Sequence, residues 1–158
     1  VLGPGDGASD RLMTDLTNSL KEGKDITLRN PNSIRPWQDI LDSIHGYILV
    51  AELNYTDKKA DIFNLNSEIN NEITTKEIAQ KMIKKWESNI NIIESKDNAF
   101  YEASKLRLDS TKAHNILGWK SQLNIDQTIE KIVDWENSND SSEAEKISFD
   151  QINKFFQS

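Results

Sequence analysis

Apolar side chains recur at helical spacing in six stretches of the chain. In residues 10–22, Leu12, Leu16 and Leu20 follow one another every four positions, so they line one face of a helix. The same criterion predicts helices over residues 38–55, 74–86, 110–119 and 124–136, and a last helix from residue 148 onward. The pattern is therefore typical of a mostly helical protein.

Several of these helices carry start and stop signals. Three pairs have the spacing of a capping box, in which two polar side chains and two backbone N–H groups satisfy one another. They are Thr74 with Glu77, Asn124 with Gln127, and Ser148 with Gln151. Asp10 is expected to cap the first helix, and Gly23 and Gly118 are expected to end the helices that precede them.

Alternating segments predict few strands. Residues 25–30 and 61–66 alternate as strands do, residues 105–109 are expected to be extended, and residues 89–94 fit either a strand or a helix end. These are too few for a sheet of normal size. The polar, acidic stretch 137–147 predicts a linker before the last helix, within an otherwise single unit of residues 1–158.

Length and composition restrict the class of protein. A chain of 158 residues with 36% hydrophobic and 28% charged side chains can bury one moderate core. It has no apolar run long enough to span a membrane, no basic-then-apolar leader and no cysteine, so we expect a cytoplasmic protein without a membrane partner. The opening VLGPGDG predicts the end of an apolar strand that runs into a glycine-rich turn, as in a chain cut within a strand.

The charge is unevenly distributed. Residues 1–37 carry equal numbers of acidic and basic side chains, so the net charge of −7 resides in the remainder of the chain. An acidic body argues against nucleic acid as a partner, because a phosphate backbone requires a basic face. It does not argue against one small anionic ligand held by a few arginines.

Familiar catalytic and metal-binding patterns are weakly represented. GPGDG, residues 3–7, lacks the spacing of phosphate-binding loops and predicts a tight turn. His45 and His114 have no second ligand one helical turn away, so no metal site is expected. Two Tyr-x-x-x-Lys pairs occur, but the glycine-rich nucleotide loop that makes such a pair catalytic is missing. No catalytic residue is therefore assigned.

The least ordinary segment is LRNPNSIRPWQDI, residues 28–40. Arg35 precedes Pro36, which keeps the backbone extended, and Trp37 is expected to pack beneath the loop. A guanidinium on a stiffened loop loses little entropy when it binds phosphate. Arg11 stands in the first turn of a helix, where its charge opposes the helix dipole, so a ligand role explains its position. The alternative for each arginine is a surface ion pair.

Four blocks that occur in order carry a resemblance to a known family. They are VLGPGDGASDRLMTDL, LRNPNSIRPWQDILDSIHGYILVAE, DIFNLNS and LRLDSTKAHNILGW. They resemble the C-terminal half of extended short-chain dehydrogenase/reductases that act on nucleotide sugars, most closely the CDP-glucose 4,6-dehydratases. The resemblance implies an α/β, Rossmann-type fold of which this chain is the mostly helical, substrate-binding C-terminal part, with the N-terminal Rossmann half absent.

The resemblance also implies roles for individual residues. Arg35 is expected to hold the substrate pyrophosphate, Arg11 to approach the nucleotide, and Glu102 to lie near the ribose or base. Asp39 stands where the family often has histidine and is expected to add negative charge near the phosphate. The intact parent would be an NAD-dependent lyase that forms homodimers, whereas this part alone would hold no cofactor and would be inactive.

Two other interpretations stay open. In the first, the chain is a non-catalytic module that binds nucleotide sugars or pairs with another subunit. In the second, it is part of a nucleotide-sugar epimerase of the same superfamily. In each case the expected small-molecule partner is a nucleotide sugar.

Overall fold

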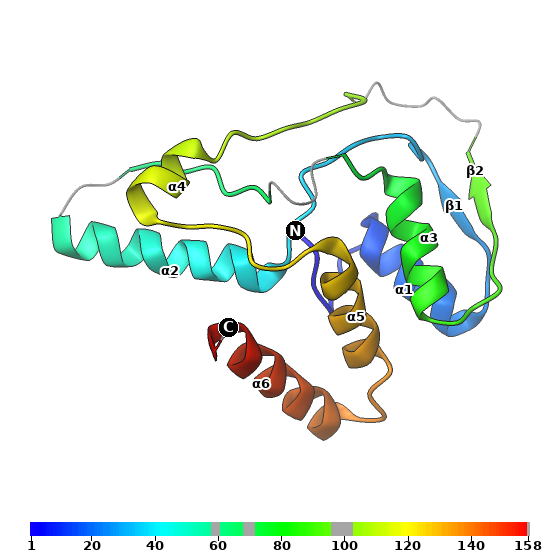
Figure 1. Cartoon of the computed structure of the whole chain (residues 1–158). Helices are drawn as coiled ribbons and strands as arrows, with labels where there is room; N and C mark the ends of the chain where they lie inside the picture. Colours follow the sequence, from blue (N-terminus) through cyan, green and yellow to red (C-terminus); the bar gives the residue numbers. More distant parts are fainter. Residues whose placement is uncertain (58–60, 68–71, 96–102, 158) are drawn as a thin grey trace.

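The computed structural model describes residues 1–57, 61–67, 72–95 and 103–157. Its helices and strands follow in the order α1 (Leu12–Glu22), β1 (Ile26–Leu28), α2 (Ile40–Asp57), α3 (Thr75–Lys85), β2 (Ile92–Glu94), α4 (Thr111–Leu117), α5 (Ile125–Glu136) and α6 (Ser141–Gln157). Figure 1 shows α1, α3 and the two strands on one side of the molecule, α2 and α4 on the other, and α5 between them. The prediction of a mostly helical chain is confirmed.

The main core lies among α1, α3, α5 and the small sheet. Leu16 of α1, Ile78 and Met82 of α3, and Ile129 of α5 are fully or almost fully buried there. β1 pairs in parallel with β2, with Ile26 opposite Ile92, so residues 92–94 form a strand rather than a helix end. The apolar stripes that predicted these helices are therefore the stripes that form the core.

A second layer is built on α2. α4 packs against α2, and the indole of Trp119, which follows α4, is buried beside it. Gly46 makes this approach feasible, because a Cβ there would lie 2.4 Å from Leu65 Cδ1 and 3.1 Å from Trp119 Nε1. An added Cβ at position 46 would therefore require the Leu65 side chain to move.

The predicted strand over residues 61–66 is wrong. Ile62 is largely exposed, and no strand forms between residues 61 and 67. The buried Asn66 instead donates a hydrogen bond from its side-chain Nδ2 to the carbonyl of Leu108, at 3.1 Å. This side-chain hydrogen bond to the segment of Leu108 stands in place of the backbone hydrogen bonds that a strand over residues 61–66 would have formed.

The last helix begins earlier than predicted. Asp140 Oδ1 accepts hydrogen bonds from the backbone N–H groups of Ser142 and Glu143, both at 2.9 Å, and so begins α6 at residue 141. Ser148 lies inside the helix and donates from its hydroxyl to the carbonyl of Ala144 at 2.8 Å. The linker predicted over residues 137–147 is therefore reduced to residues 137–140.

Other local signals have mixed outcomes. The capping boxes at Thr74 and Asn124 are both formed, and Gly23 and Gly118 end their helices with positive φ. Asp10 does not cap α1, whose N-cap position is occupied by Arg11 without a side-chain capping bond.

Candidate functional site

The loop of residues 31–37 lies at a junction of three chain segments. Ile34 forms an antiparallel bridge with Thr74 on one side and a parallel bridge with Lys105 on the other. The Ile34 N–H donates to the carbonyl of Ser104 at 2.9 Å, and the Leu106 N–H donates to the carbonyl of Ile34 at 3.0 Å. The loop is therefore held by backbone hydrogen bonds to segments that are distant in sequence.

Side chains of the loop also fasten it to the main core and to the start of α3. The indole Nε1 of Trp37 donates to the carbonyl of Ile73 at 2.8 Å, and its ring packs against the main core. The Thr75 N–H donates to the carbonyl of Ser33 at 2.9 Å, and the two hydroxyls of these residues lie 2.8 Å apart. The loop is ordered by contacts within this chain, which lowers the entropy that a bound ligand must remove.

Arg35 projects from this loop toward the segment that follows Glu102. Its Nη1 donates to the carbonyl of Ala103 at 2.8 Å and to the carbonyl of Ile34 at 2.9 Å. Glu102 lies outside the described residues, but its sequence neighbour is thus in direct contact with Arg35. The geometry gives Arg35 a structural role, because its guanidinium fastens the loop to the segment that contains Ala103.

Arg11 lies at the start of α1 and is largely exposed, with 65% of its side-chain surface accessible. Its Nη1 lies 3.2 Å from Asp6 Oδ2 across the glycine-rich turn. The nearby Arg29, which follows β1, forms a similar exposed ion pair with Asp10 at 3.1 Å. Exposed pairs of this kind contribute little to stability, so the Arg11 guanidinium can exchange the Asp6 carboxylate for another anion at low cost.

The charge of Asp39 does not face the arginine loop as predicted. Its side chain is 2% exposed, and both carboxylate oxygens accept hydrogen bonds from Lys131 Nζ of α5, at 3.1 and 3.2 Å. The N–H of Leu41 donates to the same carboxylate at 2.8 Å. The ion pair neutralises Asp39, so its negative charge does not oppose phosphate at the loop.

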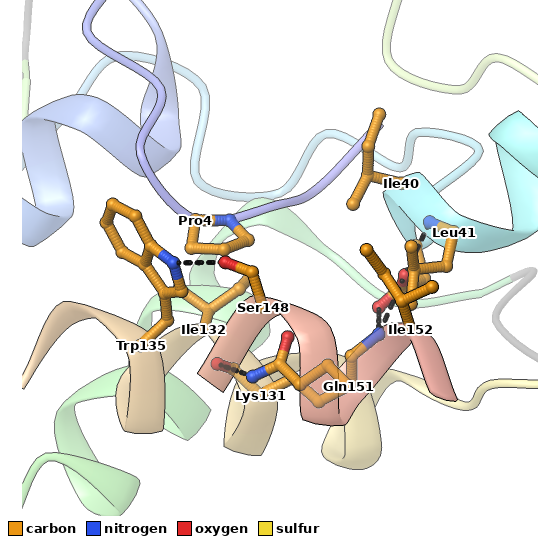
Figure 2. A pocket seen from close by; sticks show the side chains of 10 residues that line it. Pro4, Ile40, Leu41, Lys131, Ile132, Trp135, Ser148, Gln151 and Ile152 are labelled. Carbon is orange, nitrogen blue, oxygen red and sulfur yellow. Dashed lines mark hydrogen bonds and ion pairs between the residues drawn. The ribbon is translucent and has the colours of Figure 1, made fainter. Parts of the chain in front are cut away.

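This ion pair borders a pocket of about 220 Å³ between α5, α6 and the start of α2 (Figure 2). Trp135 and Ser148 lie at one end, joined by a hydrogen bond of 2.9 Å from the indole to the hydroxyl, and Leu41 and Ile152 lie at the other. The remaining walls are Pro4, Ile40, Ile132 and Gln151. The pocket is mostly apolar, and its principal charges neutralise one another.

Asp42 is a residue that the sequence pattern did not single out. Its buried carboxylate accepts hydrogen bonds from the Gln122 N–H at 2.8 Å and the Ser121 hydroxyl at 2.9 Å, and its carbonyl accepts from the Trp119 indole at 3.0 Å. Burial raises the pKa of Asp42, although these hydrogen bonds act in the opposite direction. Its place in the first turn of α2 was the available signal, and its role is to fasten α2 to the segment after α4.

The glycine-rich turn does not fit a dinucleotide phosphate. The Gly5 N–H already donates to Glu136 Oε1 at 2.9 Å, and a Cβ at Gly5 would lie 3.1 Å from the ring of Trp135. A carboxylate therefore stands where a phosphate would have to bind, and the prediction of a tight turn is confirmed.

Across residues 1–57, 61–67, 72–95 and 103–157, no three His, Cys, Asp or Glu side chains gather into a group that could hold a metal ion. Among the helices in these ranges, none is both long and apolar enough to cross a membrane.

The fold and the blocks around this site define a family. Residues 4–132 match the model of the GDP-mannose 4,6 dehydratase family, and the chain belongs to that family. Among its relatives is the CDP-glucose 4,6-dehydratase of Salmonella typhimurium, which is 36% identical over 137 residues, a match that covers 85% of this chain and 38% of that enzyme. The predicted resemblance is therefore confirmed.

Solved structures share the fold at low identity. RMD from Pseudomonas aeruginosa complexed with NADPH superposes with a TM-score of 0.69 at 19% identity, covering 85% of this chain and 45% of that one. UDP-glucose 4-epimerase from Thermotoga maritima with UDP-glucose superposes with a TM-score of 0.69 at 17% identity. This match covers 84% of this chain and 41% of that one. dTDP-glucose 4,6-dehydratase from Bacillus anthracis in complex with NAD superposes with a TM-score of 0.67 at 16% identity. This match covers 93% of this chain and 45% of that one.

These comparisons confirm the predicted fold class. The chain shares its fold with part of these Rossmann-type enzymes, and it spans less than half the length of the relatives it matches.

Proposed function

We propose that this chain binds a nucleotide sugar and is the substrate-binding part of an NAD-dependent CDP-glucose 4,6-dehydratase. The observation that carries the proposal is the ordered arginine loop, because its R-P-W-Q block is held at a three-segment junction that presents a guanidinium beside residue 103. The 36% identity to the Salmonella CDP-glucose 4,6-dehydratase supports the choice of substrate.

In this proposal Arg35 holds the pyrophosphate, Arg11 approaches the nucleotide, and Glu102 lies near the ribose or base. A guanidinium suits a diphosphate because its fork of N–H donors matches phosphate oxygens in two places. Arg11 exchanges its pairing with Asp6 for the ligand, since that ion pair is exposed.

The reaction of the intact enzyme needs NAD, and we expect this chain alone to hold none. When bound in the intact enzyme, NAD would supply the oxidation at C4 of the glucose and would return the hydride to C6 after the loss of water across C5 and C6. The Gly5 N–H of the glycine-rich turn already donates to Glu136 Oε1, so this turn does not offer that N–H to a dinucleotide phosphate. We therefore expect this chain alone to bind CDP-glucose without converting it.

An epimerase of the same superfamily is the second candidate. UDP-glucose 4-epimerase from Thermotoga maritima superposes as well as the dehydratases do. At 17% identity the likeness to the epimerase indicates only a shared fold. The relative that is a dehydratase is 36% identical, so the dehydratase is the first candidate. A non-catalytic module would also bind a nucleotide sugar, as both enzymes do, but would not convert it.

Calorimetric titration of the chain with CDP-glucose tests the proposal, with UDP-glucose and GDP-mannose as competing ligands. We expect CDP-glucose to bind most tightly. Arg35→Ala should raise its Kd by about 10- to 150-fold, which corresponds to roughly 1.5–3 kcal/mol for a charge-assisted hydrogen bond. Preference for UDP-glucose would favour the epimerase, and the absence of binding to all three would contradict the proposal.

Matched variants separate binding from folding. Arg35→Lys keeps the charge but loses the planar guanidinium, whose Nη1 donates to the carbonyls of both Ile34 and Ala103, so it should recover part of the affinity. Arg29→Ala removes a guanidinium whose ion pair with Asp10 is exposed, and it should leave both Kd and Tm unchanged. Unchanged affinity in Arg35→Ala would remove this residue from the site.

A further inference from the structure

The pocket between α5, α6 and the start of α2 has the size of a site for a small ligand. Its volume is about 220 Å³. An apolar cavity of roughly 150 Å³ takes up benzene, whereas drug-sized ligands occupy pockets of roughly 300–1,000 Å³. The pocket is therefore large enough for a molecule of one or two rings and too small to enclose a nucleotide sugar.

The walls of the pocket favour an aromatic ligand. The indole of Trp135 lines one end and is fixed there, because its Nε1 donates to the Ser148 hydroxyl at 2.9 Å. That hydroxyl in turn donates to the carbonyl of Ala144 at 2.8 Å. An indole whose N–H group already has a partner offers its ring to the ligand, and aromatic rings pair well in stacked or edge-to-face geometry.

The buried ion pair in the wall restricts the charge of a ligand. Lys131 Nζ donates to both carboxylate oxygens of Asp39, at 3.1 and 3.2 Å, and the Asp39 side chain is 2% exposed. An anionic ligand would compete with Asp39 for the ammonium group and leave a buried charge uncompensated, and a cationic ligand would compete with Lys131 in the same way. The pocket therefore selects an uncharged molecule.

One polar group in the wall can orient such a molecule. Gln151 of α6 donates from Nε2 to the carbonyl of Lys131 at 2.9 Å, which fixes the side-chain amide. Figure 2 shows this amide between the two ends of the pocket. Within the described part of the chain, no group donates to its Oε1. An acceptor in an apolar wall suits a ligand with a hydroxyl or N–H group, because a ligand without a donor would remove water from this oxygen and replace it with nothing.

We propose that this pocket is a binding site for an uncharged aromatic molecule of one or two rings that carries a single hydroxyl or N–H group. The ring packs against Trp135 and the apolar walls, and the hydroxyl or N–H group donates to Gln151 Oε1. Neither Arg11 nor Arg35 lines the pocket, so the site is separate from the arginine loop and does not depend on the proposed function.

Calorimetric titration of the whole chain with four small probes tests the proposal. Indole and phenol are neutral and carry one donor, toluene has no donor, and benzoate is anionic. We expect indole and phenol to bind with Kd values below about 1 mM. Toluene should bind at least about fivefold more weakly, because it leaves Gln151 Oε1 without a partner, and benzoate should not bind.

Variants of α6 locate the bound molecule. Gln151→Met keeps the length of the side chain and removes the acceptor, so the preference for phenol over toluene should disappear. Ile152→Trp should fill the other end of the pocket and abolish the binding of indole and phenol. Phe149→Trp is the matched control, because Phe149 is 57% exposed on the same helix and does not line the pocket, and it should bind like the wild type. Because Ile152 is itself 40% exposed, circular dichroism should show unchanged folding in both tryptophan variants.

Four outcomes would overturn this inference. They are the absence of indole and phenol binding, phenol that binds no more tightly than toluene or benzoate, unchanged binding in Ile152→Trp, and displacement of bound phenol by CDP-glucose. The last outcome would make the pocket part of the substrate site. Phenol binding without any binding of CDP-glucose would support the pocket and contradict the proposed function alone.

Discussion

The buried pair of Lys131 and Asp39 joins α5 to the start of α2, and its removal should destabilise the fold strongly. Lys131→Met keeps the aliphatic stem and removes the ammonium group. Asp39 would then keep its hydrogen bond from the Leu41 N–H but lose both bonds from Lys131 Nζ, while its side chain stays 2% exposed.

The magnitude follows from the burial of the two partners. Breaking a buried ion pair by removing one partner typically costs about 3–5 kcal/mol, because it leaves an uncompensated charge. The Lys131 side chain is 18% exposed, so water can reach the vacated place, and we expect a loss near the lower end, about 3 kcal/mol. In contrast, the double variant Asp39→Asn/Lys131→Met buries no charge and should recover at least half of that loss.

Urea unfolding followed by tryptophan fluorescence measures these differences. Lys81→Met is the control, because its ion pair with Asp126 is exposed and should contribute no more than about 1 kcal/mol. A loss below 1 kcal/mol in Lys131→Met would refute the reasoning. So would a double variant that loses as much as the two single variants together, because the two groups would then not be coupled.

Four further perturbations test the packing and the helix ends. Trp119→Ala should cost about 3–5 kcal/mol by opening a cavity beneath α2, and an unchanged thermal melt would show that Trp119 has no packing role. Gly46→Ala should cost about 1–3 kcal/mol, because its Cβ would lie 2.4 Å from Leu65 Cδ1, whereas a Cβ at Gly7 meets nothing within 4 Å and Gly7→Ala serves as the control. Thr74→Ala should cost about 1 kcal/mol at neutral pH. The hydrogen bonds from Thr74 lower the pKa of Glu77, so Glu77 stabilises α3 above its usual pKa and loses this effect as the pH falls through the folded value. The cost of Glu77→Gln in urea melts should therefore shrink in acid, and a cost independent of pH would contradict it.

Features that are encoded locally could be predicted from the sequence. The capping boxes at Thr74 and Asn124 and the left-handed glycines at 23 and 118 depend on residues within a few positions of one another, and the structure contains all of them. The capping pattern at Ser148 failed because Asp140 offered an earlier N-cap, and the helix once begun continued through Ser148. Spacing alone does not decide between two competing caps.

The candidate site depends more on long-range contacts. The X-Pro step and the tryptophan indicated a stiff loop at Arg35, and the structure contains an ordered loop there. The partner of Asp39 lies 92 residues away on α5, so nothing near Asp39 in the sequence indicates that its charge is neutralised. The proposed ligand roles of Arg35, Arg11 and Glu102 stay predictions until binding is measured.

The three-segment junction at Ile34 has a consequence for how the molecule folds. Its contacts close long stretches of chain, since Ser33 meets Thr75 42 residues away and Arg35 meets Ala103 68 residues away. Contacts of large sequence separation lose loop entropy before they gain stabilisation, and they slow folding. We therefore expect the arginine loop to be ordered late, after α1, α3 and α5 have assembled. A nucleotide sugar that binds only the finished junction would then retard unfolding while leaving the rate of folding nearly unchanged.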